Sequence, residues 1–119
     1  MTSRPMTMDV LAITATDILQ MTPVDGEAGI AAVIGCPALA HIDLHHDVVL
    51  WFDAAHTDPQ RRPNMAAVCL LCNCSDQDPD VMPIPADTVV LTGTDPTTGA
   101  PAPLRSEQYI ALAQTLMAD

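Results

Sequence analysis

The sequence predicts a single α+β domain, in which a mostly antiparallel sheet of about four strands carries two or three packed helices. Three observations lead to this prediction. The chain has 119 residues, the length of one domain. Short apolar stretches rich in β-branched residues indicate strands. Longer stretches with capping residues and glycine stops indicate helices. The predicted order is β-α-β-β-α-β-α over residues 1–119, with residues 1–7 as a loose N-terminal leader.

A strand and a helix are predicted first. Residues 9–14, DVLAIT, are apolar and β-branched, which is typical of a strand, and the following TATDILQMTP is ambiguous. In VDGEAGIAAVIGCP, Asp25 can cap a helix and Gly35 can end it. The helical period places its inward face at Ile30, Val33 and Ile34.

The next segment predicts a hairpin. Ile42 and Leu44 alternate with polar side chains, as in a half-exposed strand. These polar residues are His41, Asp43 and His45. After the short polar break HHD, residues 48–52 form an unbroken apolar run, which indicates a strand covered on both faces.

The C-terminal half predicts two further helices and a strand. NMAAVCLLC is expected to be a helix capped by Asn64, and TVVLTGT a strand. SEQYIALAQTLMAD is expected to be a helix capped by Ser106. Its predicted inward face consists of Tyr109, Ile110, Ala113 and Leu116 or Met117. We expect the hairpin and this last strand to pair around the first strand.

Several short motifs occur in a characteristic order: PVDGEAGIAAVIG, a hairpin ending in DVVLWFDA, PN at the start of an Ala-rich helix, DTVVLTGTD and LRSEQYIAL. Over roughly residues 8–115 the chain thereby resembles a family of short uncharacterised proteins from actinobacteria, plasmids and bacteriophages. The resemblance implies a mobile-element setting and assigns no catalytic residue. The chain departs from the family pattern in its cysteines and its His-rich hairpin.

Charge and composition exclude several classes of function. The net charge is −11, so the surface repels phosphate backbones and general nucleic-acid binding is not expected. Because no signal peptide or membrane-spanning apolar run is visible, we expect a cytoplasmic protein that does not associate with membranes and keeps its four cysteines reduced. GxSxG, P-loop, HExxH and GxGxxG motifs are absent from the sequence, and no enzyme activity is predicted.

The segment RRPN is the main candidate for ligand binding. Arg61 and Arg62 directly precede the predicted helix start at Asn64, where backbone N–H groups and a partial positive charge are available. Guanidinium groups add bidentate donors for phosphate or carboxylate. We therefore expect a small anionic, nucleotide-like ligand, with Arg105 in a similar setting at the last helix. The alternative is a solvated loop whose arginines pair with Asp53 or Asp58.

Two groups of residues could hold a metal ion. His41 and Asp43 are about 7 Å apart on one strand face and could share a metal, whereas His45 is about 13 Å from His41. Cys69 and Cys72 are about 60° apart on a helix. A solvent-exposed hairpin and core packing of the cysteines are favoured over metal binding, so no cofactor is predicted.

The helix that carries these cysteines contains no charged residue from 65 to 72. One wide face would hold Met65, Val68, Cys69, Leu71 and Cys72, with Ala66 and Leu70 opposite. A helix that is apolar all round is buried on all sides, so we expect a homo-oligomer. The sequence thus predicts a non-catalytic binding protein for a small anion, with sequestration of a host signal as one role. The alternatives are an acidic protein–protein module or DNA mimic acting on a basic host protein, and a metal-binding hairpin.

Overall fold

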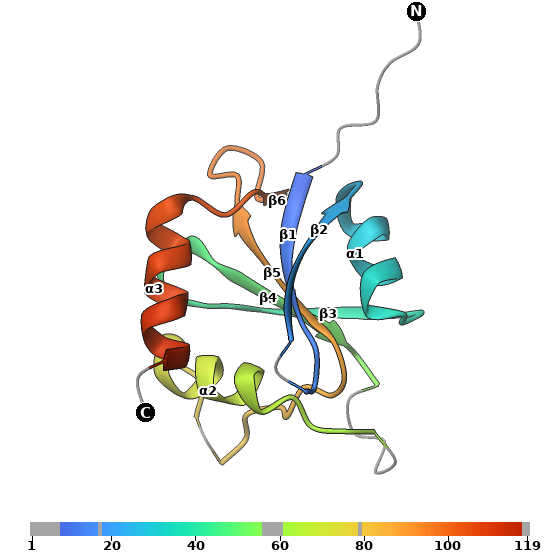
Figure 1. Cartoon of the computed structure of the whole chain (residues 1–119), viewed down its shortest axis with the longest axis vertical. Helices are drawn as coiled ribbons and strands as arrows, with labels where there is room; N and C mark the ends of the chain where they lie inside the picture. Colours follow the sequence, from blue (N-terminus) through green and yellow to red (C-terminus); the bar gives the residue numbers. More distant parts are fainter. Residues whose placement is uncertain (1–7, 17, 56–60, 79, 118–119) are drawn as a thin grey trace, which may run out of the picture.

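The computed structural model describes residues 8–16, 18–55, 61–78 and 80–117, which form an α+β fold (Figure 1). The elements in chain order are β1 (Met8–Ile13), β2 (Leu19–Val24), α1 (Gly26–Ile34), β3 (Leu39–Asp43), β4 (Val49–Asp53), α2 (Met65–Cys74), β5 (Val89–Thr94), β6 (Pro101–Ala102) and α3 (Ser106–Met117). A short 3-10 turn, η1 (His45–Asp47), joins β3 to β4 where the polar break was expected. The predicted α+β class and antiparallel sheet are confirmed.

The sheet contains two strands more than the predicted four. Its longer strands follow the order β2-β1-β5-β4-β3, and the two-residue β6 pairs with the end of β5. The strand β5 lies at the centre, between β1 and β4. The hairpin β3–β4 therefore pairs with β5 and not with β1, which corrects the predicted arrangement around the first strand.

The strand β2 occupies the segment whose sequence was ambiguous. Of its six residues only Val24 is buried, so no alternation of apolar and polar residues marks it. It also contains Pro23, which is tolerated because β2 is an edge strand. Antiparallel pairing with β1 holds it, from Met8↔Val24 to Ile13↔Leu19.

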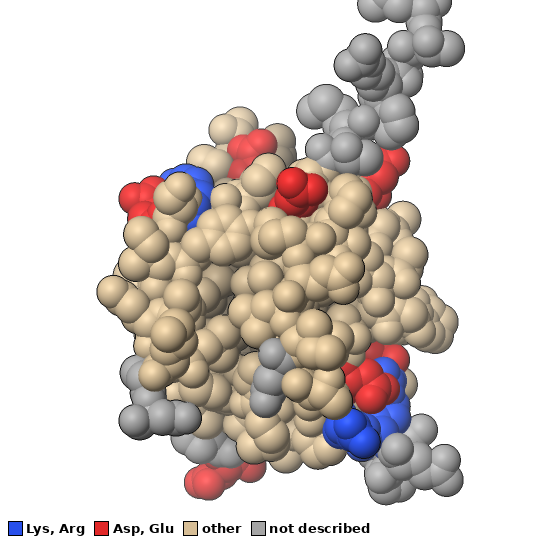
Figure 2. Space-filling model, viewed as in Figure 1, with Lys and Arg blue, Asp and Glu red and all other residues tan. Residues whose placement is uncertain are grey.

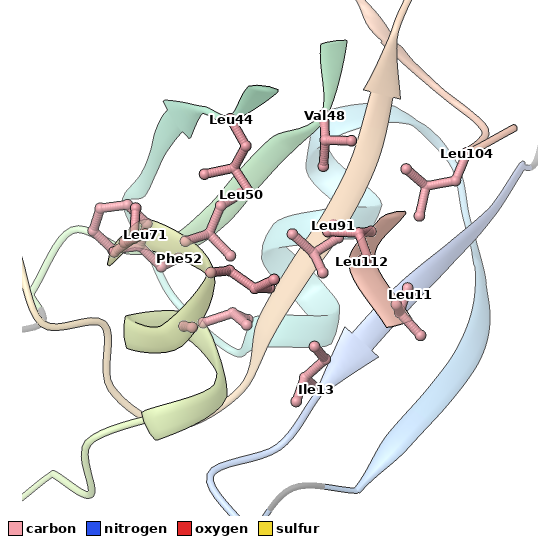
Figure 3. Packing of buried hydrophobic residues seen from close by; sticks show 13 residues of the cluster. Leu11, Ile13, Leu44, Val48, Leu50, Phe52, Leu71, Leu91, Leu104 and Leu112 are labelled. Atoms are coloured by element: carbon pink, nitrogen blue, oxygen red, sulfur yellow. The ribbon is translucent and has the colours of Figure 1, made fainter. Parts of the chain in front are cut away.

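Two hydrophobic cores lie on opposite faces of the sheet. In β1, Val10 and Ala12 belong to the core under α1. The alternate residues Leu11 and Ile13 belong to the core under α2 and α3, as the two-residue period of a strand requires. Figure 1 shows this layering, and Figure 3 shows the second core, which is aliphatic except for Phe52.

The helix α2 is not buried on all sides, contrary to prediction. Its buried residues are Ala67, Leu70 and Leu71, whereas Met65 and Cys72 are exposed. The rotation of the helix follows from its capping residue. Asn64 is fully buried, so residues three and seven positions later face the core with it. Apolar composition alone could not reveal this rotation.

The ends of α1 agree only partly with prediction. Gly35 ends the helix in the left-handed conformation (φ 77°), as expected. Asp25 occupies the N-cap position, but its side chain makes no capping hydrogen bond. Ile30 and Ile34 are buried, while Val33 is half-buried.

The helix α3 is rotated relative to its predicted position. Gln108 and Leu112 are its buried residues. Tyr109 and Leu116 are half-buried against the core as predicted, whereas Ile110, Ala113 and Met117 are exposed. The helix begins at Ser106 itself. The side chain of Gln108 determines the rotation, because its Oε1 accepts the N–H of Arg105 at 2.7 Å and its Nε2 donates to the carbonyl oxygen of His46 at 2.8 Å.

Candidate functional site

Arg61 is bound to two carboxylates of its own chain. Its Nε donates to Oδ2 of Asp87 at 2.7 Å, and its Nη1 donates to Oδ2 of Asp53. The side chain of Arg61 is only 18% exposed. The hydrogen bonds to Asp53 and then Asp87 raise the pKa of Arg61 above its ordinary value. The alternative in which an arginine pairs with Asp53 is therefore confirmed, in a shielded and not a solvated setting, and Asp58 lies outside the described residues.

Asn64 holds the start of α2 against the sheet. Its Oδ1 accepts the N–H of Ala67 at 3.0 Å, which confirms the predicted cap. Its Nδ2 donates to the carbonyl oxygens of Ile13 at 2.9 Å and Asp87 at 2.7 Å. The residue is fully buried, so the amide joins β1, the residues just before β5 and α2.

The other two predicted arginines are separate from each other. Arg62 has an exposed side chain, and its carbonyl oxygen accepts the N–H of Asp87 at 2.8 Å. Arg105 lies at the start of α3, where its Nε is 3.3 Å from Glu107 Oε1. Figure 2 shows positive charge in two separate places, each beside negative charge. Of the three predicted arginines, Arg62 is the one without a carboxylate partner among the described ion pairs.

The residues of the predicted metal-binding hairpin have different neighbours. His41 packs its ring against Trp51, with centroids 5.0 Å apart. Asp43 is exposed on the edge strand β3. His45 belongs to η1, and its Nε2 lies 3.1 Å from Oδ1 of Asp76. Within the described parts of the chain, no three His, Cys, Asp or Glu side chains are grouped to hold a metal ion.

Two of the three cysteines of α2 lie against Thr115 of α3. Cys69 is half-buried, with its Sγ 3.9 Å from the carbonyl oxygen of Thr115. Cys74 is half-buried, with its Sγ 3.4 Å from the hydroxyl oxygen of Thr115. Cys72 is exposed. Packing against α3 therefore accounts for Cys69 and Cys74, whereas the prediction of core packing is wrong for Cys72.

A polar hollow of about 380 Å³ lies beside η1, a feature that the sequence did not reveal. Its lining comes from η1, the end of α2 and α3 and consists of His45, His46, Asn73, Cys74, Ala111, Gln114 and Thr115. The backbone of His46 and Asp47 is left-handed there, with φ of 65° and 62°, and Gln108 binds both carbonyl oxygens. Since these residues come from three distant segments, only the tertiary structure brings them together. The hollow can offer hydrogen bonds, but it has no lysine or arginine in its lining.

Five large apolar side chains form an exposed surface, which we call the apolar face: Leu19, Met21, Met65, Ile110 and Met117. Leu19, Met65 and Met117 line one groove of about 490 Å³ between β2, α2 and α3. Met21 is joined to α3 by the hydroxyl of Tyr109, which lies 3.3 Å from its sulfur. Ile110 stands two turns before Met117 on the same side of α3.

Among the described residues, charged groups lie around the apolar face and not within it. The coloured part of Figure 2 shows uncharged atoms over most of the side formed by β2, α2 and α3, with carboxylates and arginines at its margin. None of the residues that line the groove is charged. For a chain of net charge −11, this is an unusual distribution, because single exposed apolar residues are ordinary but a contiguous apolar surface marks an interaction site.

Comparisons with known proteins give no relative from which a function could be inferred. No protein-family profile, no curated protein and no solved structure matches the chain significantly. The resemblance to short proteins of actinobacteria and phages therefore stays a prediction. None of the helices in the described regions is both long enough and apolar enough to span a bilayer.

Proposed function

We propose that the protein is a non-catalytic protein-interaction module that contacts another polypeptide through the apolar face. The observation that carries the proposal is the position of Leu19, Met65 and Met117, which surround one groove yet remain exposed. Burying a Leu or Met side chain contributes about 1.5–3 kcal/mol, so several of them together can drive association. Methionines suit such a surface because their flexible, polarizable side chains adapt to a partner.

The acidic remainder of the surface restricts the kind of partner. Arg61 and Arg105 pair with carboxylates, so they do not offset the excess of negative charge elsewhere. Nucleic acid would be repelled, which leaves proteins as the partners that suit the apolar face. The setting in a phage or other mobile element, and a role against host defence, belong to this proposal as its biological context.

Site-specific photo-crosslinking in the cells that produce the protein tests the proposal. A benzophenone amino acid replaces Ile110 in the apolar face, and the matched control carries it at Glu27 on α1, which covers the opposite side of the sheet. Both positions are exposed on helices. We expect a protein adduct from position 110 and not from position 27. Absence of any adduct at 110, or equal adducts at both positions, would contradict the proposed function.

A second candidate function is binding of a basic host protein by the carboxylates, including imitation of DNA. It is favoured by the exposed carboxylates of Asp43, Asp47 and Asp76, none of which has an arginine partner among the described ion pairs. Capture of a basic protein should weaken as salt is added, because screening acts on exposed charges. Arg62→Ala should leave it unchanged, whereas stabilisation by a nucleotide that this substitution removes would favour the small-anion hypothesis.

A further inference from the structure

The backbone of β2 has hydrogen-bonding groups directed away from the sheet. The N–H of Thr14 donates to the carbonyl oxygen of Ile18 at 3.0 Å, next to the pair Ile13↔Leu19. Hydrogen-bonded and non-hydrogen-bonded pairs alternate in an antiparallel ladder. The even-numbered residues of β2 therefore bond to β1, and the odd-numbered Leu19, Met21 and Pro23 direct their backbone groups outward. The lack of an N–H on Pro23 fits this assignment, since proline in an edge strand directs its nitrogen away from the ladder.

This edge has one of the features that usually prevent strand addition, the proline at position 23, but not the charged side chains. Charged side chains protect most exposed edges, and β2 (Leu19–Val24) contains none. The other edge, β3, differs. There the N–H of Ala54 donates to the carbonyl oxygen of Ala38, so Leu39, His41 and Asp43 are directed outward, and the last carries a charge. Of these two edges, β2 is the one without a charged residue. It also lies in the apolar face.

We propose that a second copy of this chain docks on β2 in antiparallel orientation, so that the two sheets become one. This inference rests on the proposed interaction role of the apolar face and names its partner. The symmetry of the open backbone groups selects the copy, because the outward residues Leu19, Met21 and Pro23 are centred on Met21 and match the same three residues of a second chain. Two chains of net charge −11 repel each other wherever their carboxylates meet, and the uncharged side around β2 is the surface on which they can approach closely. A basic partner, in contrast, would be attracted to the acidic margin.

A two-fold axis at Met21 gives the register in which the open backbone groups match. The two Met21 residues then exchange both backbone hydrogen bonds, and each Leu19 N–H reaches the carbonyl oxygen of Pro23 in the other chain. The missing N–H of Pro23 leaves two symmetric gaps in this ladder, one for each chain. The side chains of Leu19 and Met21 from the two chains then contact one another, on the face of the joined sheet that α2 and α3 cover. The same surface serves both partners, as an isologous interface requires.

Sedimentation velocity of the purified full chain, over concentrations up to about 100 µM, tests the inference. We expect a species of twice the chain mass. In Met21→Pro only an outward N–H is lost, so the bonds to β1 persist while the dimer should become monomeric at the same concentration. His41→Pro, which removes an outward N–H from the opposite edge, is the matched control and should remain dimeric. Circular dichroism melts establish that each variant is folded.

Met21→Glu provides a second variant in case the proline prevents folding. It keeps the backbone donor but sets two carboxylates beside the two-fold axis, and we expect it to be monomeric at low salt. A wild-type chain that stays monomeric throughout the concentration series would overturn the inference. So would a dimer that persists in Met21→Glu or in folded Met21→Pro. If the chain is monomeric but photo-crosslinking from position 110 still gives an adduct with a different protein, only the inference that the partner is a second copy is overturned. If no adduct forms at position 110, the proposed interaction function is overturned as well.

Discussion

Replacing Asn64 with alanine should strongly lower the free energy of unfolding. The sequence predicted a ligand contact at this residue, whereas its hydrogen bonds in the fold give it a structural role. The substitution removes the acceptor that caps α2 at the N–H of Ala67. It also removes the donor for the carbonyl oxygens of Ile13 and Asp87. Ile13 and Ala67 are fully buried, so water cannot easily replace the lost amide. We expect the loss to appear without any ligand in the sample.

The magnitude follows from these contacts. Loss of a helix N-cap costs about 1 kcal/mol. The buried carbonyl of Ile13, left without this donor, costs about 1–2 kcal/mol, and the part-buried carbonyl of Asp87 costs less because water can reach it. The sum is about 2–4 kcal/mol of the free energy of unfolding, a large part of the roughly 5–15 kcal/mol that holds a typical domain together. The melting temperature should fall by about 8–16 °C.

Urea unfolding followed by circular dichroism measures the effect. Asn64→Asp separates the capping role of the side chain from its role as a hydrogen-bond donor. The carboxylate can still accept the N–H of Ala67, but its second oxygen would face two carbonyl oxygens and repel them. This variant should therefore be at least as destabilised as Asn64→Ala. Asn73→Ala is the matched control, since this exposed asparagine of the same helix bonds only to Cys69. Its free energy of unfolding should change by less than about 0.5 kcal/mol. An Asn64→Ala protein within 1 kcal/mol of the wild type would refute the structural role.

Three further predictions concern other parts of the fold. In Gly29→Ala the new Cβ would lie 2.9 Å from the Cβ of Val24, so overpacking of about 1–3 kcal/mol should outweigh the gain in helix propensity and lower the thermal midpoint. Burial, followed by the carboxylate of Asp53, raises the pKa of Cys36, so iodoacetamide should modify it more slowly than the exposed Cys72 in peptide mass spectrometry. Burial also raises the pKa of Tyr109, and the protonated phenol is the form that folding favours. The stability it contributes is complete below pH 10.0 and declines as the pH rises through the folded value, and ultraviolet titration of this single tyrosine should give a higher midpoint in buffer than in concentrated urea.

The sequence predicted the strands in which buried positions produce a recognisable pattern of apolar residues along the strand. Four of the five longer strands were predicted, because continuous or alternating apolar residues mark β1, β3, β4 and β5. In β2 only Val24 is buried, so the strand exists through its pairing with β1 and not through its own composition. Helix rotation escaped prediction for a related reason. In α2 nearly every residue is apolar, and the buried amide of Asn64 decides which of them face the core.

In the segment from Arg61 to Asn64, the sequence predicted the helix start but not the ion pairs of Arg61 with both carboxylates. The helix start at Asn64 was placed correctly, since a capping residue acts on its immediate neighbours. The carboxylates that engage Arg61 come from the end of β4 and from the residues before β5, and pairing at that sequence distance depends on the sheet order. The apolar face could not be predicted, because the sequence assigned Met65, Ile110 and Met117 to buried helix faces and left the segment of Leu19 and Met21 ambiguous.

Salt dependence separates the two kinds of association that this surface supports. A dimer through β2 brings two chains of net charge −11 together by apolar contact, so added salt screens their repulsion and should strengthen it. Binding of a basic partner to the carboxylates gains from attraction, and the same salt should weaken it. Sedimentation and partner capture between roughly 0.05 and 0.5 M salt, across which the Debye length falls from above 10 Å to about 4 Å, therefore give opposite trends. If self-association also weakened with salt, ion pairs and not the uncharged edge of β2 would hold the two chains together.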